Sequence, residues 1–208
     1  MTREEINKHY ENIRDIVNYV RISWHFFDQL FRSGEDNLRL LSKSAGHLFR
    51  RVYDSLYVTV LLRICTLTDP DRTNNRYDNL SFKKLAKQIQ ELDGSAGTTI
   101  LNQIEAEQSH FVHLRNLRDK SIAHTDLETF GTHSGPAKEI DSAIEALLRI
   151  LDCFEDYLKP SEKRWRYIPH FPPGSDGGAL LSILRHREEL IAERNDLINI
   201  SSLRDSGP

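Results

Sequence analysis

The residues best suited to chemistry lie in one short stretch, His113–Asp126, which holds two arginines, a lysine, two histidines and two aspartates. Arg118 offers a permanent cation whose planar fork of N–H donors suits a phosphate group. His124 has an ordinary pKa of about 6.5, so it transfers protons near neutral pH. Cleavage of RNA without a metal ion needs both functions, proton transfer and a cation that stabilises the charge on the reacting phosphate.

The spacing of the two residues restricts how they work together. Six residues on a straight α-helix place His124 about 120° around the axis from Arg118, so the two do not share a face. Either the helix ends or kinks near Ser121, or the site is composite, with both groups contributed by each subunit across a two-fold axis. The alternative is that these residues have a structural role and no catalytic one. Arg115, Arg118 and Lys120 then form a solvated face, and His124 is a cation at a helix end, where the helix dipole favours it.

A metal site is the main chemical alternative. Glu107, His110 and His113 recur every three residues, so one helical face presents all three. No further cluster of cysteine and histidine in the sequence completes the set, and we expect neither a metal nor a cofactor. Cys65 and Cys153 lie on apolar helical patterns and are predicted to be buried thiols in a reducing compartment.

Helices must position these residues, because a helical repeat of apolar residues runs through nearly the whole chain. Asp69-Pro70 ends the second of them, since the residue before proline avoids helical backbone angles. Ser81 is the expected N-cap of a short helix, and the glycine-rich Asp93–Gly97 ends it. No strand pattern is evident. We therefore expect an all-α fold with helices over about 2–31, 36–67, 82–92, 99–123, 137–158 and 179–198.

The first helix carries a heptad seam, in which apolar residues alternate at spacings of four and three. Such a seam is typical of helices that pair with one another, and it favours a homodimer. Its members are Ile6, Tyr10, Ile13, Val17, Val20, Trp24, Phe27 and Phe31.

The 208 residues suit one domain. We expect residues 1–159 to form a helical bundle and 179–208 to add a C-terminal helix and tail to the same domain. Between them, residues 160–178 are rich in proline, glycine and aromatic residues, and are predicted to form an ordered strap across the bundle.

Charge and hydropathy exclude some classes of function. The formal net charge is -3, so any contact with RNA must come from a local basic patch. The longest apolar run, Leu56–Ile64, is interrupted by Arg63 and is far shorter than the roughly 20 residues that a membrane span needs. The first residues lack the apolar stretch of a signal peptide. We therefore expect a cytoplasmic protein.

The segment from Arg118 to His124 resembles the signature of the HEPN superfamily: an arginine, a polar residue (here Asp119), and a histidine after four to six intervening positions. The preceding helix over 54–69 and the short helix start at Leu80-Ser81 are also similar to HEPN-like proteins of the abortive-infection (Abi) U type. The resemblance covers about Tyr53 to Asp126.

This resemblance implies an antiparallel bundle of long helices that dimerises through the motif helices. Many members of the superfamily are metal-independent ribonucleases in phage defence or toxin–antitoxin systems. Carried over, Arg118 and His124 are catalytic and Asp119 orients them. We also predict phosphate contacts at Arg115, Asn116 and Lys120, although the motif itself supports neither Asn116 nor Lys120.

Two functions follow as hypotheses. One is an endoribonuclease that cleaves RNA as a homodimer and has an antitoxin as a possible partner. The other is a non-catalytic dimerisation or interaction module of the same fold. A nuclease needs Arg118 and His124 to be reachable from solvent, whereas an interaction module would bury them in salt bridges. The sequence identifies neither the RNA nor the partner.

Overall fold

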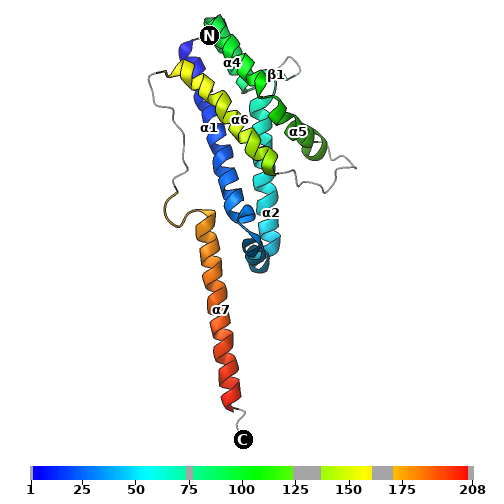
Figure 1. The fold of residues 1–208 in the computed structure, drawn as a ribbon, viewed down its shortest axis with the longest axis vertical. Helices are drawn as coiled ribbons and strands as arrows, with labels where there is room; N and C mark the ends of the chain where they lie inside the picture. Colours follow the sequence, from blue (N-terminus) through cyan, green and yellow to red (C-terminus); the bar gives the residue numbers. More distant parts are fainter. Residues whose placement is uncertain (1, 74–76, 124–136, 161–170, 206–208) are drawn as a thin grey trace. The chain divides into compact units, whose positions relative to one another are not determined.

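The computed structural model describes residues 2–73, 77–123, 137–160 and 171–205, which are almost entirely helical (Figure 1). The all-α prediction is confirmed. In chain order the helices are α1 (Arg3–Phe27), π-helix η1 (Asp28–Arg32), α2 (Glu35–Thr68), α3 (Phe82–Leu92), α4 (Gly94–Ala106), α5 (Ser109–Leu117), π-helix η2 (Arg118–Ala123), α6 (Ala137–Leu158) and α7 (Gly177–Asp205).

One small β-ribbon departs from the prediction that no strand occurs. Strand β1 (Arg72–Thr73) pairs in antiparallel fashion with β2 (Tyr77–Asp78). The Arg72 Nε donates to Asp78 Oδ1 at 2.9 Å, and the Asn79 N–H closes the turn on the Asp71 carbonyl at 2.9 Å. Two residues per strand are too few for an alternating pattern to be visible in the sequence.

The chain divides into two compact units. Unit 1 comprises residues 1–24 and 54–168, and unit 2 comprises residues 25–53 and 169–208. Residues 161–170 of the expected strap lie outside the described residues. The assignment of the whole chain to one domain stays a prediction. No helix in the described ranges is long and apolar enough to cross a membrane.

The heptad seam of α1 is buried within the fold of a single chain. Its members from Ile6 to Phe27 are each no more than 5% exposed. In unit 1, the Tyr10 hydroxyl donates to Glu155 of α6 at 2.6 Å, and Trp24 Nε1 donates to Asp141 of α6 at 2.7 Å. The seam therefore packs on the chain's own helices and no longer supports a homodimer. The homodimer prediction now rests on the family resemblance alone.

Helices α3 and α4 are joined by a single residue, Asp93. It is the C-cap of α3, and its carboxylate accepts from the N–H groups of Ser95 and Ala96 as the N-cap of α4. The Ser81 hydroxyl caps the start of α3, as predicted, by accepting from Lys84 N. Helix α3 ends at Leu92, as predicted, but the capping carboxylate of Asp93 starts α4 at Gly94, before the predicted start at about Thr99.

The predicted helix over 99–123 is divided into three elements. Between α4 and α5 the N–H groups of Gln108, His110 and Phe111 bond three residues back instead of four, which breaks the α-helical ladder. Both α4 and α5 pack against α6 in unit 1. The α-helical geometry changes again at Arg118, where η2 begins.

Unit 2 contains η1, the first half of α2, and α7. Leu30, Leu41 and Leu181 form its buried core. Asp176 caps α7 by accepting from Ala179 N at 2.8 Å, and it also accepts from Gln29 Nε2 at 3.1 Å. Helix α7 is therefore tied to η1 at its start, and it runs beyond the predicted 179–198.

Candidate functional site

The motif arginine lies where an α-helix gives way to a π-helix. Helix α5 ends at Leu117, and η2 continues from Arg118 to Ala123. Single π-helical turns recur at functional sites because they displace side chains from the regular helical positions. The sequence predicted an end or a kink near Ser121, and the structure places the change already at Arg118.

Two carboxylates hold the guanidinium of Arg118. Its Nη1 lies 2.8 Å from each oxygen of Asp69, and its Nε donates to Asp119 Oδ1 at 2.8 Å. The side chain is 22% exposed. Burial disfavours its charge, but the hydrogen bonds to Asp119 and Asp69 outweigh burial and raise the pKa of Arg118. Arg118 is therefore a fixed and permanent cation with part of its surface open to solvent.

Asp69 was not predicted as part of the site. It directly follows Thr68, the last residue of α2, and its partner lies 49 residues later in the chain. The only local sequence feature that could have pointed to Asp69 is its place at the carboxyl end of a helix, where the helix dipole disfavours a negative charge.

The other predicted phosphate contacts surround Arg118 unevenly. Asn116 and Lys120 are exposed, whereas Arg115 is partly buried and donates to the side chain of Gln108. His124 lies outside the described residues. The structure thus brings Arg118 and Asp119 together, and the pairing of Arg118 with His124 stays a prediction.

The alternative metal face is organised around an ion pair. Arg149 of α6 donates to both oxygens of Glu107 at 2.8 and 2.7 Å. His110 Nε2 lies 3.5 Å from Glu107, but His113 Nε2 lies 3.5 Å from a different carboxylate, that of Glu139. Among the described residues no group of three His, Cys, Asp or Glu is arranged to hold a metal ion.

The ion pair of Glu107 predicts a pH-dependent stability. Hydrogen bonds from Arg149 hold the pKa of the Glu107 carboxyl below its ordinary value. Because the folded pKa is lowered, the stabilisation is present above the unfolded pKa of about 4.3 and is lost as the pH falls through the folded pKa. Glu107→Gln is expected to lower the free energy of unfolding at pH 7 by about 1–2 kcal/mol, since Arg149 is partly solvated.

Urea unfolding at pH 7 and at pH 3 measures this effect, and the deficit of Glu107→Gln should shrink at pH 3. Glu105→Gln is the matched control, because Glu105 is an exposed residue of the last turn of α4, two residues before Glu107. A deficit that stays equal at both pH values would contradict the assigned ion pair.

The cysteines are not arranged for catalysis. Cys65 is fully buried, and burial raises the pKa of its thiol to about 12, although Arg118 nearby acts in the opposite direction. A thiol with so high a pKa stays protonated and is a poor nucleophile at neutral pH. Cys153 is partly buried, and neither cysteine forms a disulfide.

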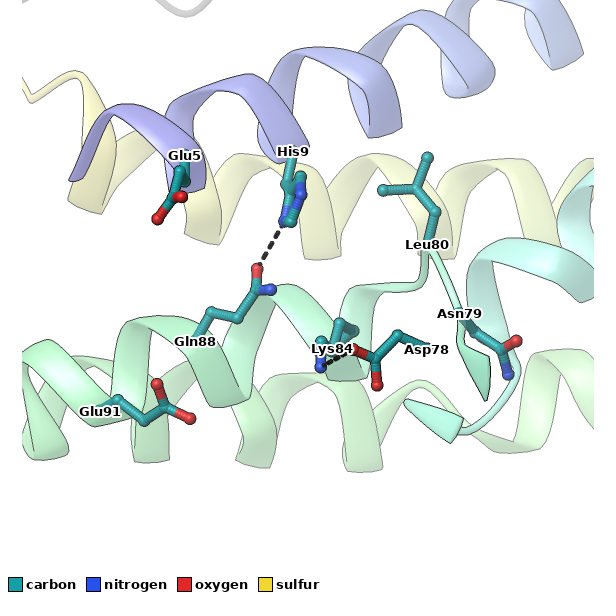
Figure 2. Close-up of a pocket in the computed structure, with 8 residues that line it drawn as sticks. All are labelled: Glu5, His9, Asp78, Asn79, Leu80, Lys84, Gln88 and Glu91. Carbon is teal, nitrogen blue, oxygen red and sulfur yellow. Dashed lines mark hydrogen bonds and ion pairs between the residues drawn. The ribbon is translucent and has the colours of Figure 1, made fainter. Parts of the chain in front are cut away.

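A polar cleft of about 570 Å³ lies elsewhere in unit 1, between α1 and α3 (Figure 2). His9 Nδ1 lies 2.9 Å from the Gln88 amide oxygen, and Lys84 pairs with Asp78 at 2.9 Å. None of the described residues that the sequence predicted for the site lines this cleft. Its walls are formed by Glu5, His9, Asp78, Asn79, Leu80, Lys84, Gln88 and Glu91.

Comparison with known proteins identifies the family of the chain. No curated protein and no solved structure matches the chain. The profile of the AbiU2 family of HEPN domains matches residues 3–157, which run from the start of α1 almost to the end of α6. That span includes Arg118, Asp119 and His124 and amounts to most of the chain. The chain therefore belongs to the AbiU2 family of HEPN domains, which is a family of abortive-infection proteins.

Proposed function

We propose that the chain is a metal-independent endoribonuclease of a phage-defence or toxin–antitoxin system, with Arg118 and His124 as its catalytic residues. The observation that carries the proposal is the state of Arg118: a fixed, permanently charged guanidinium, 22% exposed, at the point where α5 becomes η2. Arg118 is also the arginine of the HEPN-like motif, and the chain belongs to a family of abortive-infection proteins.

The chemistry needs no cofactor. The 2′-hydroxyl of the RNA attacks the adjacent phosphorus and loses its proton to a base, while the bond to the 5′-oxygen breaks and that oxygen takes up a proton. His124 is the group suited to these transfers. Arg118 stabilises the extra negative charge on the phosphate oxygens during the attack. The products are a 2′,3′-cyclic phosphate and a 5′-hydroxyl.

A dimer is part of this proposal. A two-fold interface presents the same patch twice, so a second copy would bring a second Arg118 and a second His124 to one groove. The local charge supports phosphate binding only modestly, because Asp69 and Asp119 offset two of the three cations Arg115, Arg118 and Lys120.

Incubation of the purified protein with total RNA in EDTA tests the proposal. We expect RNA cleavage with 2′,3′-cyclic phosphate ends, and no cleavage of DNA, which lacks the attacking hydroxyl. The control is the His124→Ala variant in the same buffer. Cleavage that disappears in EDTA and returns with a divalent metal would instead point to the face of His110 and His113.

The second candidate is a non-catalytic interaction module, and one observation favours it. Arg118 is already bonded to two carboxylates, as expected of a cation with a structural role. On this alternative the wild-type protein cleaves no RNA in any buffer, and the His124→Ala variant has a much lower melting temperature than the wild type.

A further inference from the structure

The carboxylate of Asp69 stands where helix electrostatics disfavours a negative charge. It follows the last residue of α2, and the carboxyl end of a helix carries a partial negative charge of about half an electron. The pairing with Arg118 at 2.8 Å offsets this cost. Departures from local rules of this kind cluster at functional sites.

The backbone beside Asp69 is held rigidly. Pro70 has a fixed φ, and its carbonyl accepts from Asn79 Nδ2 at 2.8 Å and from Ser81 Oγ at 3.5 Å. Ser81 is itself fully buried at the start of α3. Asp69 therefore lies on a corner that α2 and α3 fix together, and its carboxylate is only 26% exposed.

Asp119 contrasts with Asp69 in position and in exposure. It is adjacent to Arg118 on η2, is 57% exposed, and takes the Nε donor. The Nε and Nη2 groups form the two-pronged edge of a guanidinium that binds a phosphate. Asp119 accepts from Nε and so occupies half of that edge, whereas Asp69 accepts from Nη1, which lies outside the edge.

We propose that Asp69 is a positioning residue that holds Arg118 through Nη1, so that an RNA phosphate takes the Nε–Nη2 edge by displacing Asp119. This inference rests on the proposed ribonuclease function. It assigns opposite kinetic roles to the two carboxylates, and it gives Asp69 the orienting role that the resemblance implied for Asp119. Loss of Asp69 misplaces the catalytic cation and lowers kcat, because a cation displaced by about 1 Å stabilises the transition state poorly. Loss of Asp119 removes a competitor of the substrate and lowers KM.

The test compares steady-state kinetics of Asp69→Asn and Asp119→Asn on one labelled RNA in EDTA. Asp69→Asn keeps the shape of the side chain but removes its charge, and it is expected to lower kcat by about 10- to 100-fold with little change in KM. Asp119→Asn is expected to lower KM and to preserve kcat. A fall in kcat that is equally large for both variants would overturn this division.

Asp71→Asn is the matched control. Asp71 lies two residues from Asp69, is similarly exposed, and pairs with Lys87 at 2.8 Å, so its substitution removes a comparable ion pair away from Arg118. It should cleave RNA as the wild type does. Melting temperatures of both variants separate a kinetic effect from unfolding.

If Asp69→Asn does not fold, Asp69→Glu decides, because it keeps the charge but moves it by one methylene group. It should melt near the wild-type temperature and cleave more slowly, and full activity would overturn the role of Asp69. Cleavage by the wild type together with an unchanged Asp69→Asn would overturn this inference alone. An inactive wild type would overturn the ribonuclease proposal, and the role of Asp69 with it.

Discussion

Replacement of His124 by alanine is expected to slow RNA cleavage by about 10²–10⁴-fold, the usual contribution of a general acid or base. The variant keeps Arg118 and its two carboxylates, so RNA should still bind. Single-turnover cleavage of a labelled RNA in EDTA measures the rate constant separately from binding. The matched control is His113→Ala, since His113 is an exposed histidine at 61% on α5. Full activity of His124→Ala with loss in His113→Ala would place proton transfer on α5.

The same experiment extends to the cation. Arg118→Lys keeps the positive charge but loses the planar fork of donors, and it should lose most of the activity. The structure makes lysine more informative than alanine at this position. Arg118→Ala would leave the half-buried carboxylate of Asp69 unpaired, at a cost of about 1–3 kcal/mol in stability. A fully active Arg118→Lys variant would mean that charge alone suffices at this site.

Local patterns in the sequence predicted most of the helices. Helix α6 has the predicted bounds, because its apolar residues recur at a strict helical spacing and Ile140, Leu147 and Phe154 are fully buried. Arg118 and Asp119 were singled out from a motif that is contiguous in sequence, and their functional role stays a prediction. Signals of this kind need no knowledge of what packs against the helix.

The features that were missed depend on contacts between distant residues. Asp69 pairs with Arg118 across 49 positions, and no local sequence pattern indicates a contact between residues so far apart in the chain. The break between α4 and α5 coincides with Glu107, whose partner Arg149 lies 42 positions away. The heptad seam of α1 was correctly identified as a packing surface, but periodicity does not distinguish a second chain from α6 of the same chain.

The glycines at the start of α4 show most clearly what the sequence does not resolve. Gly94 and Gly97 together are typical of a loop, yet both lie in the first turn of α4. Their environments differ. A Cβ on Gly97 would lie within 3.0 Å of backbone atoms of Gln90 in α3, whereas a Cβ on Gly94 would have nothing within 4 Å. Gly97 is therefore required for the close approach of α3 and α4, and Gly94 is not.

Gly97→Ala is accordingly expected to lower the free energy of unfolding by about 2–3 kcal/mol, because the overlap is with a helix backbone that must move as a whole. Gly94→Ala should have the opposite sign and stabilise the protein by about 0.4–1 kcal/mol, since alanine restricts the unfolded chain. Urea unfolding followed by circular dichroism compares the two variants directly. If both variants were stabilised, α3 and α4 would have to lie further apart than the contact at Gly97 requires.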